Sequence, residues 1–195
     1  YSWQRNFKFN LKIITYLEYT FQFILFHCLF AQDIYDDMEK KIAVIGAGNL
    51  GLSLAKGLVE SKTYKPNQFN LSRRRIEKLK NMAQDGYNIY NDNVEAIKNA
   101  NIVVIAVLPQ KINDVLDELK GSLNEKHLLI SLVSGVEISS IKEIIGSKIP
   151  IIRAMPNTAI SIRESMTCIT TIPKWENHLD IVKALFNDVG ETAII

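Results

Sequence analysis

The sequence contains few cysteines, few histidines and almost no excess of charge of either sign. Its two cysteines, Cys28 and Cys168, are too few for a disulfide framework and lack metal-ligand spacing, which suggests a reducing compartment. The three histidines are scattered along the chain, so we predict no metal site. The net charge of +2 is too small to favour nucleic acid or an anionic membrane as a partner. We therefore expect a cytoplasmic protein that binds no nucleic acid and no membrane.

Residues 1–37 lack glycine and any clean helical or strand periodicity. They are crowded with aromatic and long apolar side chains, and three interpretations compete: a targeting or membrane segment, an added structural element, or an extension outside the functional protein. Charged and polar residues interrupt the apolar stretch, which makes it a poor membrane span. Because Met38 directly precedes the first expected strand, we favour the extension and place the domain at residues 38–195.

The rest of the chain alternates between short apolar strands and helical patterns. The run at 102–107 is continuously apolar, as expected of a strand covered on both faces of a parallel sheet. Repeated strand–helix units with short connections predict an α/β fold, with a doubly wound, mostly parallel sheet of the Rossmann type. The expected strands are 41–45, 68–72, 87–90, 102–107, 128–133, 149–153, 165–170 and 192–195, and the expected helices are 50–60, 74–85, 94–98, 112–119, 138–145 and 175–189.

A glycine-rich turn joins the first expected strand to the first expected helix. It follows Ile45 directly and reads Gly46-Ala47-Gly48-Asn49-Leu50-Gly51. In this setting the first glycine permits a tight turn, the second lets the backbone approach a phosphate, and the third lets the helix pack closely on the strand. The free amides and the positive end of the helix dipole favour a pyrophosphate. We therefore predict that residues 45–51 bind a dinucleotide.

The end of the second expected strand has no carboxylate, although NAD-binding folds place one there, about 20 residues past the glycines, to bind the ribose hydroxyls. Ser72, Arg73 and Arg74 stand there instead. A serine hydroxyl can donate to a phosphate oxygen, and a guanidinium can bind one through its planar fork. The alternative is that the arginines only begin an exposed helix, whose dipole they would oppose. We predict NADP as the cofactor, with NAD as the less favoured alternative.

Three further loops follow expected strands at the edge where such sheets bind ligands. They read Ala106-Val107-Leu108-Pro109, Val133-Ser134-Gly135 and, at 153–159, Arg-Ala-Met-Pro-Asn-Thr-Ala. Together with Ser165-Met166-Thr167, they resemble the pyrroline-5-carboxylate reductases, and the resemblance extends over residues 38–195. Two positions depart from the family pattern, because Leu108 stands where lysine is common and Ala159 where a second proline is common. The family mostly uses backbone groups at the first of these loops, so the assignment does not depend on Leu108.

The resemblance implies a role for each matching segment. The turn would hold the pyrophosphate, and Ser72 with Arg73 would meet the adenosine 2′-phosphate. Asn93 would contact the adenosine side of the cofactor, although it could equally be the cap of a short helix. Residues 106–109 and 133–135 would line the ribose and nicotinamide. The catalytic region beside the nicotinamide and the imine would comprise Met155, Pro156 and Asn157.

The implied reaction is the NADPH-dependent reduction of 1-pyrroline-5-carboxylate to L-proline, the last step of proline biosynthesis. A protonated imine is a good hydride acceptor, so the protein would mainly align two rings and exclude water. This fits the lack of an evident acid–base pair in the sequence. Cys168 lies in an expected strand and is interpreted as a buried apolar side chain, not as a nucleophile.

Members of the resembled family continue into a helical domain that forms the dimer and holds the substrate carboxylate. The resemblance therefore implies that this chain is a C-terminally truncated fragment of a homo-oligomeric enzyme, able to bind NADP but inactive by itself. Because one fold hosts many chemistries, the glycines alone cannot choose among them. The alternatives are a reductase of another small carbonyl, imine or deazaflavin substrate, and a non-catalytic NADP-binding module.

Overall fold

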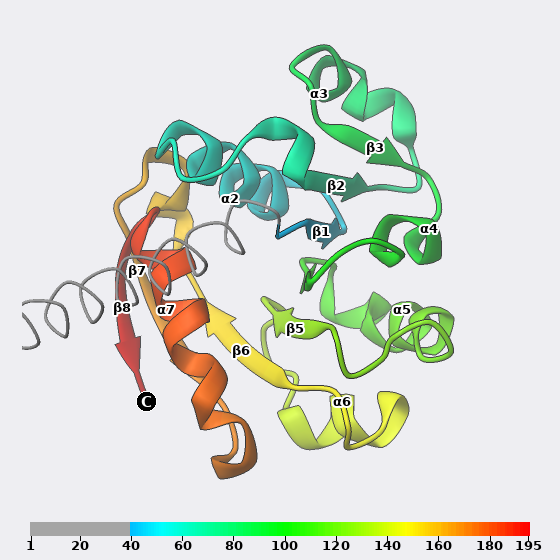
Figure 1. Cartoon of the computed structure of the whole chain (residues 1–195), viewed down its shortest axis with the longest axis vertical. Coiled ribbons are helices and arrows are strands. Elements are labelled where there is room, and N and C mark those ends of the chain that lie inside the picture. Colours follow the sequence, from blue (N-terminus) through cyan, green and yellow to red (C-terminus); the bar gives the residue numbers. More distant parts are fainter. Residues whose placement is uncertain (1–39) are drawn as a thin grey trace, which may run out of the picture. The chain divides into compact units, whose positions relative to one another are not determined.

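The computed structural model describes residues 40–195, which form an eight-stranded sheet with helices on both faces (Figure 1). The strands lie in the order β3-β2-β1-β4-β5-β6-β7-β8. Their bounds are β1 (Ile42–Ile45), β2 (Phe69–Ser72), β3 (Asn88–Tyr90), β4 (Ile102–Ile105), β5 (Leu128–Ser131), β6 (Ile151–Met155), β7 (Ser165–Thr170) and β8 (Gly190–Ile194). The helices are α2 (Asn49–Glu60), α3 (Lys80–Gln84), α4 (Asn93–Ile97), α5 (Ile112–Leu119), α6 (Ile138–Ile145) and α7 (Leu179–Asn187).

Strands β1 to β6 run parallel, so their carboxyl ends meet at one edge of the sheet. In β1, Ile42 pairs with Phe69 of β2 on one side and with Ile102 of β4 on the other. The strand order therefore reverses between β1 and β4, and such a switch opens a crevice at the carboxyl edge. β7 runs antiparallel to β6, and β8 runs parallel to β7. The predicted Rossmann-type, mostly parallel sheet is confirmed.

Each face of the sheet has its own layer of helices and its own apolar core. Ile42 and Val44 of β1 pack in the core that includes residues of α2 and α7. The alternate residues Ala43 and Ile45 pack in the opposite core, with residues of α4, α5 and α6. Figure 1 shows α4, α5 and α6 along one side of the sheet and α2 with α7 along the other. Because helices cover both faces, every residue of β1, β4 and β5 is buried, as their apolar sequences predicted.

The predicted boundaries are most accurate where the apolar periodicity is clear. Helices α5 and α6 and strand β7 occupy the expected ranges 112–119, 138–145 and 165–170. The strand expected at 149–153 begins instead at Ile151. Pro150, which precedes Ile151, has no N–H to donate to a strand ladder, so the ladder starts at the residue after the proline.

Two expected helices are each divided into two shorter pieces. The helix expected at 74–85 is a 3₁₀ helix, Ile76–Leu79, followed by α3, and neither piece has a side-chain cap. Three consecutive arginines at its start oppose the helix dipole, which disfavours an earlier beginning. The helix expected at 175–189 begins as a 3₁₀ helix at Pro173–His178 and continues as α7. Proline is well placed in that first turn because its missing N–H is not needed there.

Residues 1–39 lie outside the part of the chain that the structure describes. The extension predicted at 1–37, and the interpretation of Cys28, therefore stay predictions. Within residues 40–195, no helix combines the length and the apolar composition that crossing a membrane requires.

Gly190 begins β8 and permits close contact between β8 and β7. Its φ is +147°, and a Cβ at this position would lie 2.0 Å from the backbone oxygen of Ser165. We expect Gly190→Ala to lower the free energy of unfolding by about 3 kcal/mol, because the strands must separate and the backbone is strained. Urea unfolding would measure this. Gly121→Ala is the matched control, since a Cβ at Gly121 would meet no atom of residues 40–195 within 4 Å. Equal effects of the two substitutions would contradict the prediction.

Candidate functional site

The segments predicted to bind a cofactor all follow strands whose carboxyl ends share one edge of the sheet. In spatial order along that edge they follow β3, β2, β1, β4, β5 and β6. A dinucleotide lying along this edge would therefore meet the adenosine-side residues first, then the glycine turn, and then the predicted nicotinamide loops. The structure thus places most of the sequence-predicted residues in the linear order that the resemblance requires.

The glycine turn after β1 is held between β2 and β4. The backbone amides of Gly46 and Ala47 both donate to the carbonyl oxygen of Ser72, at 3.1 and 2.9 Å. Gly46 has a φ of +87°, and a Cβ there would lie 2.6 Å from Cγ1 of Val107 and 2.8 Å from the carbonyl oxygen of Ala106. Only glycine satisfies both constraints, so the tight turn predicted at this position is present.

Gly51 has the packing role that the motif predicts. A Cβ there would lie 2.8 Å from Cγ1 of Val44 and 3.0 Å from the carbonyl oxygen of Gly46. Its absence allows the first turn of α2 to approach β1 closely. This contact places the beginning of the helix directly at the carboxyl edge.

Gly48, in contrast, is not required by any contact within the described residues. The nearest atom to a Cβ at Gly48 would be the carbonyl oxygen of Gly46, at 3.9 Å, and its φ of −92° is open to other residues. No residue within 40–195 accepts a hydrogen bond from the amides of Asn49, Leu50 and Gly51, and α2 has no side-chain cap. Open space beside three unbonded amides at a helix N-terminus fits an anionic phosphate group.

Ser72 is only 1% exposed and makes its side-chain hydrogen bond within the protein. Its hydroxyl is 2.6 Å from Oδ1 of Asn93, whose Nδ2 donates to Oε2 of Glu118 at 2.9 Å. The serine proton is therefore directed to Asn93, and not toward the phosphate oxygen for which we predicted it. Arg73 donates from its guanidinium to the carbonyl oxygen of Ala47 at 3.2 Å, and Arg74 is exposed beside it. The arginines are thus the accessible donors at the end of β2.

Asn93 is the first residue of α4 and does not cap it. Asp92 is the cap, because its side chain accepts the backbone amide of Glu95 at 2.9 Å. The alternative interpretation of Asn93 as a helix cap is therefore wrong. The half-buried Asn93 side chain bridges Ser72 and Glu118, and its predicted contact with the cofactor stays a prediction.

The segment after β4 contacts the glycine turn, and the loop after β5 follows the next strand along the same edge. Ala106 and Val107 are half-buried and contact the position of Gly46, whereas Leu108 is 71% exposed and Pro109 begins a 3₁₀ helix. After β5, Val133 is buried, and Ser134 and Gly135 are exposed. Gly135 has a φ of +73°, and a Cβ there would meet no atom of the described residues within 4 Å, so it is a turn with open space beside it.

The loop after β6 holds the three residues that we predicted for the catalytic region. Met155 is 42% exposed, and its sulfur lies 3.9 Å from a guanidinium nitrogen of Arg153. Asn157 begins a 3₁₀ helix, Thr158–Ile162, by accepting the amide of Ala159 at 3.0 Å. Its own amide donates to the hydroxyl of Ser165 at 3.2 Å. This loop is therefore braced against β7, with Pro156 half-buried between Met155 and Asn157.

Cys168 is half-buried in β7, so the prediction of a buried side chain is wrong. Alternate residues of β7 differ in burial, with Ser165, Thr167 and Ile169 buried and the residues between them partly exposed. Cys168 belongs to the partly exposed set, opposite Met155 of β6. The buried set includes Ile169, which packs in the core that contains residues of α7.

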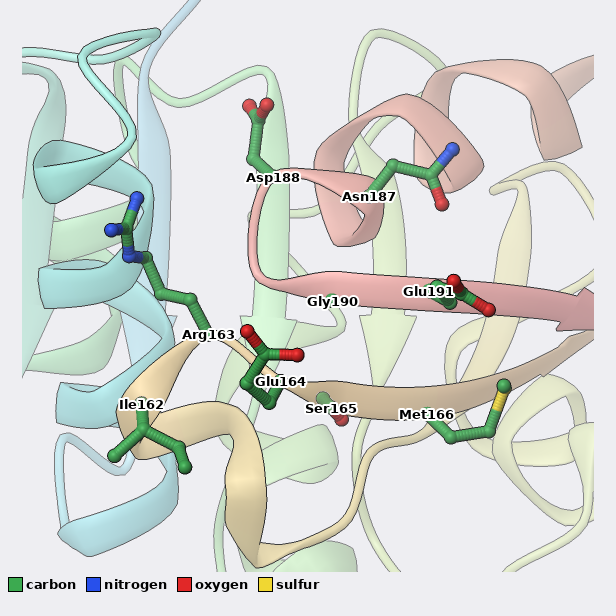
Figure 2. A pocket seen from close by; sticks show the side chains of 9 residues that line it. All are labelled: Ile162, Arg163, Glu164, Ser165, Met166, Asn187, Asp188, Gly190 and Glu191. Atoms are coloured by element: carbon green, nitrogen blue, oxygen red, sulfur yellow. The ribbon is translucent and has the colours of Figure 1, made fainter.

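A separate hollow of about 440 Å³ lies where β7 and β8 begin (Figure 2). Glu164, Asp188 and Glu191 line it together with Arg163, whose Nε lies 4.0 Å from Oε2 of Glu60 on α2. It contains none of the residues that the sequence assigned to the cofactor. Its excess of carboxylates also disfavours an anionic dinucleotide, so the open carboxyl edge, and not this hollow, is the candidate cofactor site.

Comparisons with known proteins identify relatives of this chain. A family model described as NADP oxidoreductase coenzyme F420-dependent matches residues 41–135. Pyrroline-5-carboxylate reductase 1 of Dictyostelium discoideum is 38% identical over 169 residues, which cover 80% of this chain. The chain belongs to the pyrroline-5-carboxylate reductase family. The resemblance first seen in the loops at 106–109, 133–135 and 153–159 is thus confirmed.

Solved reductases of this family have the same fold. A pyrroline-5-carboxylate reductase from Coxiella burnetii matches with a TM-score of 0.75 at 30% identity, over 80% of this chain and 59% of that one. The Plasmodium falciparum enzyme, solved with NADP bound, matches with a TM-score of 0.73 at 26% identity, over 81% of this chain and 58% of that one. The chain thus spans about three-fifths of these solved chains and 31% of the Dictyostelium protein.

Gly48 offers a direct test of the phosphate-binding role, because its substitution need not disturb the fold. We expect Gly48→Ala to weaken NADPH binding about tenfold or more, since a Cβ would occupy the space beside the unbonded amides. Fluorescence titration with NADPH would measure the affinity, and urea unfolding should show a change within about 0.5 kcal/mol. Unchanged affinity in the folded variant would contradict the role. Gly51→Ala serves as the contrast, because it should lower stability.

Proposed function

We propose that residues 38–195 form the NADP-binding domain of a reductase that converts 1-pyrroline-5-carboxylate to L-proline with NADPH. The observation that carries the proposal is the glycine turn, on the same edge as the Met155–Asn157 loop. Within residues 40–195, three amides beside it have no acceptor and Gly48 has open space beside it. The family relationship supports the same activity, and the solved Plasmodium relative holds NADP. The chain spans only part of these relatives, so the activity is proposed for the whole protein that contains it.

The residues of this chain would act by binding and orientation. The amides of Asn49, Leu50 and Gly51 would hold the pyrophosphate, and the loops after β4 and β5 would confine the nicotinamide ring. Met155 and Pro156 would place apolar surface beside the imine and exclude water. When bound, NADPH supplies a hydride from C4 of its nicotinamide to the C=N carbon. Orientation of two rings can contribute most of the rate enhancement, so this chain need not supply an acid–base pair.

The end of β2 supports NADP over NAD. Arg73 and Arg74 are accessible there, and a guanidinium suits a phosphate oxygen better than a ribose hydroxyl. NAD is the less favoured alternative. From the family relationship alone, we also propose a cytoplasmic homo-oligomer whose remaining part holds the substrate carboxylate.

A second candidate is a reductase of another small substrate, such as a deazaflavin. The description of the matching family model, NADP oxidoreductase coenzyme F420-dependent, favours it. However, that match ends at residue 135 and does not include the loop after β6. The Dictyostelium relative covers 80% of this chain, which supports the imine substrate instead.

The whole protein that carries this chain is the appropriate material for the activity test. We expect it to oxidise NADPH in the presence of 1-pyrroline-5-carboxylate and to form proline, which amino-acid analysis would detect. The 195-residue chain alone should bind NADPH without comparable turnover. Tight NADPH binding without turnover by the whole protein would favour a non-catalytic module. Turnover of a deazaflavin but not of the imine would favour the second candidate.

The arginines after β2 can be tested separately from the chemistry. We expect Arg73→Asp combined with Arg74→Asp to weaken NADPH binding about tenfold or more and to leave NADH binding within about threefold, because only NADPH carries the 2′-phosphate. Lys78→Asp combined with Lys80→Asp makes the same charge change at exposed positions farther along the chain and is the matched control. An unchanged ratio of the two affinities would overturn the NADP assignment.

A further inference from the structure

A carboxylate lies near the end of β2, but it belongs to a residue of helix α5 and not to the strand itself. The strand itself ends in Ser72 and is followed by Arg73, without an acidic residue. Glu118, on α5, reaches the same place because its Oε2 accepts from Nδ2 of Asn93, the residue that Ser72 contacts. In dinucleotide-binding folds the end of this strand meets the ribose of the adenosine. The chain therefore places one negative charge close to where a 2′-phosphate would bind.

The hydrogen bonds determine how this carboxylate is held. A carboxylate only accepts, so Nδ2 of Asn93 must face Glu118 and Oδ1 must face Ser72, whose hydroxyl then donates. Asn93 thus keeps the Glu118 carboxylate at a defined position beside the end of β2. Charge-assisted hydrogen bonds of this kind are stronger than neutral ones.

No cation within residues 40–195 forms an ion pair with Glu118, whereas the other acidic residues of α5 have one each. Asp117 lies 2.8 Å from the ammonium of Lys120, and Asp114 lies 3.1 Å from that of Lys111. Arg73, which directly follows β2, donates to the carbonyl oxygen of Ala47. Among the acidic residues of α5, Glu118 is therefore the one whose charge no cation of residues 40–195 neutralises.

We propose that Glu118 is a specificity-determining residue that reduces the preference for NADPH over NADH. Its charge, held by Asn93, repels the 2′-phosphate that Arg73 and Arg74 attract, so the net preference is smaller than the arginines alone would produce. NADH has a hydroxyl at that position and is not repelled. This inference rests on the proposed cofactor site.

The test is Glu118→Gln, because the glutamine oxygen can still accept from Asn93 while the charge is lost. We expect the dissociation constant of the 195-residue chain for NADPH to fall about threefold at low salt and that for NADH to stay unchanged, because only NADPH carries the phosphate that the charge repels. The difference should shrink at high salt. Asp117→Asn removes an equal charge one residue away and should change the NADPH affinity by less than half as much.

A second variant separates charge from positioning. Glu118→Ala also releases Asn93, so it should weaken the binding of both cofactors relative to Glu118→Gln. If Glu118→Gln changes the affinities for NADPH and NADH by the same factor, or changes neither, the ratio of the two affinities is unaltered and the inference is overturned. If the unaltered chain binds neither cofactor, the proposed function fails together with the inference; if it binds NADPH and only the ratio is insensitive to Glu118, the inference alone fails.

Discussion

The hydrogen bonds of Ser72 hold the candidate site together. Its carbonyl oxygen accepts the amides of Gly46 and Ala47, which ties the glycine turn to the end of β2. Its hydroxyl donates to Asn93, which ties the same strand to α4 and, through Glu118, to α5. Because Ser72 is 1% exposed, water does not compete for these bonds. Ser72 thus links the glycine turn, β2 and α4 by its own hydrogen bonds, and α5 through Asn93.

The three positions of the turn hold glycine for different physical reasons. Gly46 and Gly51 are required by the fold, because a Cβ at either position would collide with β1 or with the chain after β4. Gly48 has open space beside it and is not required by any contact within residues 40–195. It directly precedes the first three residues of α2, whose amides donate to no residue of the described part of the chain. The motif thus combines two glycines that packing requires with one that packing does not require, and this is the strongest physical support for the proposed phosphate binding.

Local patterns predicted the elements well where one pattern acted alone. The periodicity of 112–119 and 138–145 predicted α5 and α6 to the residue. The predicted boundaries were wrong where a second local effect competed with the periodicity. Examples are Pro150 before β6 and the three arginines before the 3₁₀ helix that leads into α3. Most of the candidate site was predictable because its loops directly follow strands. The bridging role of Asn93 and the presence of Glu118 were not, because the partners of Asn93 lie 21 and 25 residues away in the chain.

Neighbouring residues and their spacing were enough to predict the order of strands and helices, the glycine turn and the family. Which side chains are accessible became known only from the packed fold, in which Ser72 is buried, Cys168 is half-buried and Arg74 is exposed. The same packing brings a carboxylate near the end of β2, although none is adjacent in the chain. The physical reason is that burial and charge proximity arise when a sheet and its helices pack together, and α5 packs beside α4 through contacts that no local pattern encodes.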